Sequence, residues 1–312
     1  MEYEVESGEG MHILITGGTG FIGRSLIKQL IPHQMTILTR DCDKAAEQLK
    51  HVNPNCLRFI DSLHSFNCLS EFDAVINLAG EPIVDKRWSQ QQKQRICDSR
   101  WGLTQQLVEL INQSSAPPKV FISGSAVGIY GDQKQLIVDE NSPYQATGFP
   151  NYVCQKWEEI ANQAQSPLTR VITIRTGIVL GTQGGALNKM LLPYKLGVGG
   201  PIGTGQQYMP WIHIEDMVRA IQFLLDTQTA RGVFNMVAPH PTTNKEFSQV
   251  LAKTLSRPHF LFTPKFVLKL ALGESSCLLF DSVKAKPKHL TELGFTFTYS
   301  RVQPALQHLL SR

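Results

Sequence analysis

A strand, a glycine-rich turn and a helix follow one another near the start of the chain, and this order limits the fold more than any other feature of the sequence. The apolar run His12-Ile13-Leu14-Ile15-Thr16 has the length of a buried strand. The turn is Gly17-Gly18-Thr19-Gly20-Phe21-Ile22-Gly23, and a helical stretch over residues 24–30 follows it. A second strand is expected from Met35 to Thr39. The sequence therefore predicts a β-α-β unit with glycines at its first turn.

The spacing of three glycines in this turn favours a bound diphosphate. Gly17 allows a sharp turn after the strand, Gly20 allows a ligand to approach the backbone, and Gly23 allows the helix to pack closely on the sheet. The first N–H groups of the helix and its dipole then favour negative charge. We predict that the diphosphate of a dinucleotide binds to Gly17, Gly18, Thr19, Gly20, Phe21, Ile22 and Gly23. The alternative is a glycine-rich turn without a ligand.

Two basic residues favour NADP over NAD as that dinucleotide. NAD-binding folds usually place an acidic residue about 20 positions after the first glycine, where it holds the ribose 2′-hydroxyl. Here the second strand leads into Arg40, and Arg24 lies just past the third glycine. Either cation can pair with a 2′-phosphate, although Asp41 follows Arg40 at once. The alternative is that both arginines are ordinary solvated surface residues.

The strand and helix pattern continues beyond this unit. An apolar strand over residues 72–78 ends in a small-residue turn, so Leu78, Ala79 and Gly80 are expected to lie against the cofactor. A helix containing Trp101 follows, and then a strand over 119–122 that runs into Ser123-Gly124-Ser125-Ala126. This alternation predicts an α/β fold with a doubly wound parallel sheet, the Rossmann architecture.

The second half of the chain predicts a smaller, partly helical substrate domain. We assign residues 1–10 to a flexible tail, 11–182 to the Rossmann domain with 208–238 returning to it, and 183–207 with 239–312 to the substrate domain. The glycine-rich stretch 182–207 is expected to be a substrate-side loop or, alternatively, a plain connector. Asn244 is expected to cap a helix over 245–255.

Three acidic or imidazole side chains near residue 213 are expected to be structural. His213 ends a short strand that begins at Trp211, and it is expected to pack in the core. Glu215 and Asp216 follow in the first turn of the next helix, where acids suit the helix dipole, and we expect both to act as caps.

Composition excludes several classes of partner. The net charge of +4 comes from scattered Lys and Arg residues, so we expect no nucleic-acid partner. The six cysteines contain no C-x-x-C pair, which favours free thiols in a reducing cytoplasm and no metal site. No apolar run approaches the ~20 residues that span a bilayer, and no signal pattern opens the chain, so we expect no membrane partner.

A tyrosine and a lysine carry the candidate chemistry. Tyr152 and Lys156 stand four residues apart on a predicted helix, hence on one face. They follow Ser125, whose strand should reach the cofactor. The alternative is that Tyr152 is a surface tyrosine and Lys156 a solvated lysine.

These motifs together resemble the extended branch of the short-chain dehydrogenase/reductase superfamily, which includes NAD(P)-dependent epimerases and dehydratases. The resemblance rests on the 16–23 turn, Asn77-Leu78-Ala79-Gly80, Ser123 to Gly131, and Tyr152 with Lys156. It is closest to the subfamily known as nucleoside-diphosphate-sugar epimerases, through residues 77–83, 175–181, 211–216 and 290–297. One departure is Asp98-Ser99-Arg100-Trp101, where extended members often carry an asparagine. The narrower subfamily often lacks the tyrosine and lysine and sets the helix register by a Val-Cys-x-x-Trp-Glu pattern, which Val153, Cys154, Trp157 and Glu158 match. This resemblance implies the alternative that Tyr152 and Lys156 are incidental.

The resemblance implies roles for the three side chains. Tyr152 would be the acid/base, with its phenolate favoured by Lys156 and the nicotinamide charge. Ser125 would hydrogen-bond the substrate oxygen, and Lys156 would also bind the nicotinamide ribose. We therefore expect an NADP-dependent epimerase or reductase acting on a carbonyl or secondary alcohol of a small molecule, with a nucleotide sugar as one candidate. The alternative is a dinucleotide-binding regulatory or scaffold protein with little turnover. The superfamily also implies a homodimer through the helices around Trp101 and Trp157.

Overall fold

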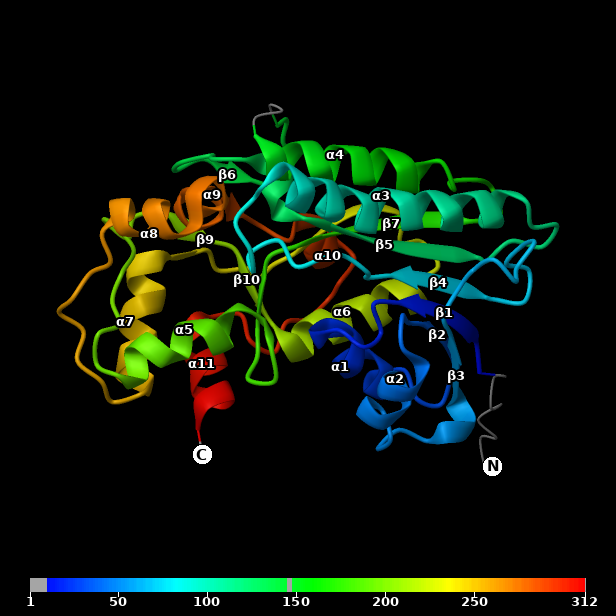
Figure 1. Ribbon diagram of the computed structural model, residues 1–312, viewed down its shortest axis with the longest axis horizontal. Helices are drawn as coiled ribbons and strands as arrows, with labels where there is room; N and C mark the ends of the chain where they lie inside the picture. The colour runs from blue at the N-terminus through cyan, green and yellow to red at the C-terminus, as the bar shows by residue number, and fades with distance from the viewer. Residues whose placement is uncertain (1–9, 145–147, 312) are drawn as a thin grey trace.

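A seven-stranded parallel sheet organises the computed structural model, which describes residues 10–144 and 148–311 (Figure 1). Apart from Gly10, the tail predicted for residues 1–10 lies outside the described residues. The strands stand in the order β11-β7-β5-β4-β1-β2-β3. Their bounds are β1 His12–Thr16, β2 Gln34–Leu38, β3 Leu57–Ile60, β4 Ala74–Asn77, β5 Val120–Ala126, β7 Arg170–Thr176 and β11 Gly232–Met236.

Helices cover both faces of this sheet. Figure 1 shows α3 (Gln90–Asn112) and α4 (Phe149–Asn162) on one face, and α1 (Phe21–Gln29), α2 (Cys42–Gln48) and α6 (Ile214–Asp226) on the other. Successive residues of β1 serve opposite faces, since Ile13 and Ile15 join the core under α1 and α6 while Leu14 joins the core under α3 and α4. Because both faces are buried, the strands are apolar throughout rather than alternating. The predicted doubly wound sheet is confirmed.

The C-terminal part of the chain is largely helical and lies beyond one end of the sheet (Figure 1). Short strand pairs link its segments: β8 with β10, β9 with β12, and β6 with β13. Three of its helices, α5, α7 and α11, pack around a second core that includes Trp211 and Phe247. The bounds are β6 Ile137–Val138, β8 Ile178–Leu180, α5 Gly185–Lys195, β9 Tyr208–Met209, β10 Trp211–His213, β12 Thr242–Thr243, α7 Asn244–Thr254, α8 Lys265–Leu272, α9 Cys277–Phe280, β13 Lys284–Ala285, α10 Lys288–Glu292 and α11 Val302–Leu310.

Several elements differ from the sequence expectation. Residues 182–207, expected to be a loop, contain helix α5, because Leu187, Leu191 and Tyr194 recur at helical spacing and are buried in the second core. The strand at Trp211 pairs with β8 outside the main sheet, so within 208–238 only α6 and β11 return to it. The cap of α7 is Thr243, whose hydroxyl accepts the Glu246 N–H, while the side chain of Asn244 accepts the Ile202 N–H instead.

His213 is buried, as expected, and it also caps α6. Its Nδ1 accepts the Glu215 N–H at 3.1 Å, which places the ring proton on Nε2, 3.2 Å from Nδ1 of His308. Glu215 also lies near this pair, but the proton on Nε2 occupies the lone pair that a metal would need. Asp216, expected to be a cap, is buried and accepts the backbone N–H groups of Thr298 and Tyr299. Burial lowers the pKa of His213 to about 4.

This lowered pKa predicts a loss of stability in weak acid. The unfolded chain binds a proton at His213 near pH 6.5, whereas the folded chain does so only near pH 4. The free energy of unfolding should therefore fall as the pH drops from about 6.5 to 4, by up to about 3 kcal/mol from this residue. Urea unfolding of the wild type and His213→Asn across this range measures the effect. A pH slope that is the same in both proteins would contradict it.

Candidate functional site

The glycine turn lies at the point where the strand order of the sheet changes direction. Gly17 follows β1, whose neighbours β2 and β4 lie on opposite sides of it, and open α/β sheets bind ligands outside the strand ends at such a point. Gly17 has φ +70°, and a Cβ on it would lie 2.7 Å from the carbonyl carbon and oxygen of Leu78. The backbones that leave β1 and β4 therefore touch, and Gly17 is required both by its conformation and by this contact.

Gly23 and Gly18 are required by packing inside the same unit. A Cβ on Gly23 would lie 2.3 Å from the Gly17 carbonyl oxygen, so at this residue α1 packs against the turn, whereas the sequence argument had placed the Gly23 contact on the sheet. A Cβ on Gly18 would lie 2.8 Å from Cγ2 of Ile37 on β2. These two glycines thus bring α1 and β2 against the turn.

Gly20 differs, because a Cβ at this position would contact almost no protein atom. Its φ is −73°, which any residue adopts, and the one neighbour within 4 Å of an added Cβ is the Gly17 oxygen at 3.1 Å. Gly20 is exposed and precedes the N–H groups of Phe21, Ile22 and Gly23, which have no acceptor within a helix that they begin. The result is an open cradle, lined by backbone donors, of the kind that fits a diphosphate.

A second glycine-rich segment rests on the start of α1. The Phe21 ring lies so close to Gly181, Gly184 and Gly185 that a Cβ on any of them would come within 3.0 Å of it. Arg24 donates from Nη2 to the Gln183 carbonyl at 3.2 Å. The segment 181–185, which leads from β8 into α5, therefore covers one side of the turn.

The remaining predicted cofactor residues also lie at the carboxyl ends of the strands. Arg40 is exposed just beyond β2, and within residues 10–144 and 148–311 it forms no hydrogen bond or ion pair. Leu78 and Ala79 are partly exposed after β4, and the Ala79 N–H donates to Oγ1 of Thr16. Gly80 is exposed, and a Cβ on it would lie 3.0 Å from the guanidinium of Arg100.

Ser125 belongs to a buried polar cluster between β5, α4 and β7. Its Oγ donates to Oε1 of Glu158 at 2.6 Å. Arg175 forms a two-pronged ion pair with Glu158, from Nε at 2.9 Å and from Nη2 at 2.8 Å. Burial disfavours the charged guanidinium, but hydrogen bonds and charge from Glu158 outweigh it, so the pKa of Arg175 is raised. Tyr130 accepts from Nη1 of Arg175 at 3.0 Å, and burial raises the pKa of its phenol.

Tyr152 and Lys156 lie on the other face of α4. The Tyr152 side chain is 57% exposed and packs edge-on against Trp101 of α3. Lys156 pairs with Glu159 at the surface. The structure therefore brings neither residue to Ser125. This placement agrees with the alternative in which Val153, Cys154, Trp157 and Glu158, all buried, set the register of the helix.

The i, i+4 pair that faces the sheet is Cys154 and Glu158. Burial raises the pKa of the Cys154 thiol to about 11, so it stays protonated beside Ser125. Arg100 lies over the Trp157 ring at 5.3 Å and donates to the Glu81 carbonyl, and burial lowers its pKa. Sequence reasoning assigned no chemical role to Glu158, Arg175 or Arg100. A signal existed, since Glu158 and Arg175 both lie in motifs that carry the family resemblance.

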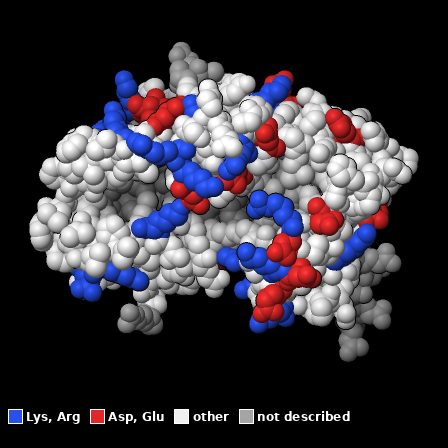
Figure 2. Space-filling view, viewed as in Figure 1, with Lys and Arg blue, Asp and Glu red and all other residues white. Residues whose placement is uncertain are grey.

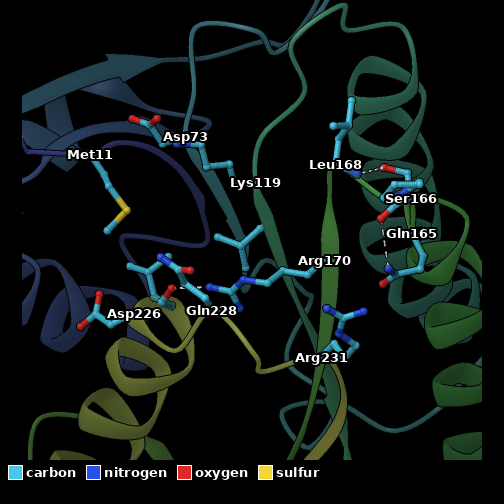
Figure 3. Close-up of a pocket in the computed structure, with 13 residues that line it drawn as sticks. Met11, Asp73, Lys119, Gln165, Ser166, Leu168, Arg170, Asp226, Gln228 and Arg231 are labelled. Atoms are coloured by element: carbon cyan, nitrogen blue, oxygen red, sulfur yellow. Dashed lines mark hydrogen bonds between the residues drawn. The ribbon is translucent and has the colours of Figure 1, made fainter.

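A cavity of about 570 Å³ lies at the amino ends of the strands, on the side of the sheet opposite to the glycine turn (Figure 3). Met11, Asp73 and Lys119 line it, and Arg170 and Arg231 face it. The Arg170 guanidinium is already bonded to the carbonyls of Leu224, Leu225 and Ala230. Since ligands of open sheets bind at the carboxyl ends, this cavity is separate from the site at the glycine turn.

Comparison with known proteins agrees with this fold. Residues 13–237 match the model of the NAD dependent epimerase/dehydratase family. The chain belongs to the NAD dependent epimerase/dehydratase family. Residues 263–309 match a second family model, a domain of unknown function (DUF1731).

Three relatives cover nearly all of this family member. The Arabidopsis thaliana protein "Epimerase family protein SDR39U1 homolog, chloroplastic" is 39% identical over 96% of this chain and 87% of its own length. The crystal structure of human epimerase family protein SDR39U1 (isoform 2) with NADPH has a TM-score of 0.87 and 32% identity, over 97% of this chain and 100% of that chain. A nucleoside-diphosphate sugar epimerase from Corynebacterium glutamicum has a TM-score of 0.73 and 30% identity, over 96% of this chain and 58% of that chain.

The glycine geometry predicts opposite effects for two alanine substitutions. Gly23→Ala would place a Cβ 2.3 Å from the Gly17 oxygen, so we expect it to destabilise the fold by about 2 kcal/mol or more. Gly102→Ala, in the exposed middle of α3 with nothing within 4 Å, should stabilise it by up to about 1 kcal/mol. Thermal unfolding of both variants measures the difference. Equal shifts in Tm would show that Gly23 is not packed as described.

Proposed function

We propose that this protein binds NADP(H) at the turn 17–23 and transfers hydride to or from a carbonyl or secondary-alcohol carbon of a small molecule, with nucleotide sugars as a candidate substrate class. The observation that carries the proposal is the cradle at Gly20, open to ligand and lined by the first N–H groups of α1. The human relative crystallised with NADPH and the bacterial relative named a nucleoside-diphosphate sugar epimerase support the two parts of the proposal.

Arg40 is the side chain that would select NADP over NAD. It stands at the carboxyl end of β2, next to β1, exposed and without an ion pair within the described part of the chain. Arg24 lies closer to the turn, but its Nη2 is held by the Gln183 carbonyl. A 2′-phosphate beside β2 would find Arg40 free to pair with it, whereas a 2′-hydroxyl would gain little from a cation there.

The buried cluster offers a route for the proton. Because the Ser125 proton is directed at Glu158, the Ser125 oxygen is free to accept a hydrogen bond from a substrate hydroxyl. In alcohol oxidation that hydroxyl would pass its proton to Oγ of Ser125, and Ser125 would pass its own proton to Oε1 of Glu158. Reduction would reverse both transfers. Arg175 holds the carboxylate in place through two hydrogen bonds, and the nicotinamide, when bound, would supply or accept the hydride.

Two variants test the cofactor assignment. Gly20→Val fills the cradle, and its Cβ would meet only the Gly17 oxygen, at 3.1 Å, so it should abolish detectable NADPH binding and lower Tm far less than Gly23→Ala does. Arg40→Ala should weaken NADPH binding by about tenfold or more through loss of a charge-assisted hydrogen bond, and leave NADH binding unchanged. Fluorescence titration with both nucleotides measures these affinities, with exposed Arg301→Ala as the control. Unchanged NADPH affinity in Gly20→Val would place the dinucleotide elsewhere.

A second pair of variants tests the proton route against the one predicted from the sequence. Substrates are first sought by NADPH absorbance with a panel of carbonyl compounds and by NMR of nucleotide sugars. With a substrate in hand, Ser125→Ala should lower kcat by about a hundredfold at unchanged NADPH affinity. Tyr152→Phe should leave kcat within about twofold. The reverse pattern would make Tyr152 the acid/base, with Lys156 as its partner.

The same assays address the scaffold alternative. A protein that binds NADPH tightly, as the cradle predicts, but turns over no compound of the panel would favour a regulatory role. Epimerisation and reduction are told apart by the cofactor, since epimerisation leaves NADPH absorbance unchanged overall and reduction consumes it. The homodimer, the cytoplasmic location and the absence of a nucleic-acid partner stay predictions.

A further inference from the structure

Helix α8 lies at the left end of the molecule in Figure 1, beyond the main sheet, and exposed apolar side chains gather around it. None of the residues of α8 is buried, and Phe266 and Leu270 are 72% and 78% exposed. Two further segments, residues 192–198 and 260–262, add exposed apolar side chains. We call the whole set the end surface: Leu192, Leu196, Val198, Phe260, Leu261, Phe262, Phe266, Val267 and Leu270.

The end surface is built by hydrogen bonds between two segments that are distant in sequence. The Gly203 N–H donates to the Thr263 carbonyl at 2.9 Å, and the Thr263 N–H donates to the Pro201 carbonyl at 2.9 Å. A Cβ on Gly200 would lie 1.8 Å from the Leu261 oxygen, so the two backbones are in direct contact. The exposed aromatic rings are therefore held on a fixed frame that joins the chain after α5 to the chain before α8.

Two segments of this part of the protein carry charge of one sign, with Glu246 and Glu274 directly outside the bounds of the second. Residues 182–214 and 247–273 contain Lys189, Lys195, Lys253, Arg257, Lys265 and Lys269 and no Asp or Glu. The rest of the chain has 24 basic and 26 acidic residues, so the net charge of +4 comes entirely from these two segments. In Figure 2 the end of the molecule that carries α8 is mostly white, with blue at its lower margin and blue next to red along its upper margin. Lys189 pairs with Asp85, whereas Lys195 and Lys269 form no ion pair within the described residues.

Helix α8 combines both properties in two turns. Lys265 and Lys269 stand four residues apart, hence on one stripe, and Phe266, Val267 and Leu270 occupy the rest of the exposed surface. A basic stripe beside exposed aromatic and aliphatic side chains is the pattern of a helix that lies in a lipid interface. Cations near an anionic leaflet are attracted to it, and apolar side chains enter the boundary of the acyl chains.

We propose that the end surface docks on a membrane that contains anionic lipids. Charge complementarity decides between the candidate occupants, because a second copy of the chain would set basic residues against basic residues, with no acid from either segment to balance them. The sequence analysis expected no membrane partner because it found no spanning segment. Likewise, no helix among the described residues is long and apolar enough to cross a bilayer. Docking on a membrane surface does not require a helix that spans the bilayer.

Vesicle sedimentation of the full chain tests the proposal. The protein should sediment with vesicles of phosphatidylcholine and phosphatidylglycerol, much less with phosphatidylcholine alone, and high salt should release it. The double variant Phe262→Ser/Phe266→Ser should bind at least about tenfold more weakly, and so should Lys265→Glu/Lys269→Glu. The matched control Leu136→Ser/Leu168→Ser removes two apolar side chains that are 68% and 64% exposed elsewhere, and it should bind like the wild type.

Three outcomes would overturn the proposal. The first is equal binding to neutral and anionic vesicles, and the second is no binding to either. The third is a wild type that is oligomeric without lipid and a Phe262→Ser/Phe266→Ser variant that is monomeric, which would make the end surface an interface between copies. NADPH affinity and Tm, measured on every variant, confirm that each one is folded, and they are independent of the lipid result because the end surface lies away from the glycine turn.

Discussion

The contact between the backbones of Gly17 and Leu78 sets the geometry on which the rest of the site depends. It joins the chains leaving β1 and β4 at the point where the sheet divides, and it tolerates no side chain on Gly17. Gly23 then sets α1 against the same turn, so the first N–H groups of the helix are fixed relative to two strands at once. A donor array fixed in this way loses little entropy when it binds an anion.

A line of buried hydrogen bonds extends this contact into the helices above the sheet. Thr16 donates to Oδ1 of Asn77 at 2.7 Å, and Asn77 donates to Thr104 at 2.9 Å. Trp157 also donates to Thr104, at 2.9 Å, and Thr104 donates to the Arg100 carbonyl at 2.6 Å. The end of β1 is thereby tied to β4, to α3 and to α4. Because buried polar groups are costly when unpaired, each member fixes the position of the next.

Sequence reasoning predicted the sheet and the turn well because both follow local rules. Strand-length apolar runs and a glycine motif between strand and helix are visible within a few residues. The side-chain cluster was harder, since Glu158 and Arg175 are far apart in sequence and nothing local shows that they pair. Tyr152 and Lys156 have the expected spacing, but a four-residue spacing does not say which face of α4 meets the sheet. Buried Val153, Cys154 and Trp157 decide that face, and their packing is a tertiary effect. In the same way, the burial of Leu187 and Leu191 turned an expected loop into α5.

The packing of the Phe21 ring against Gly181, Gly184 and Gly185 has a consequence for how the two halves of the protein are connected. The Phe21 ring at the start of α1 packs against the chain that leads into α5, and Arg24 adds a hydrogen bond to the Gln183 carbonyl. A shift of α5 toward or away from the sheet would therefore displace Phe21, the first residue of the helix that follows the glycine turn. The helical half of the protein and the start of the helix that follows the glycine turn are therefore joined by direct side-chain and backbone contacts.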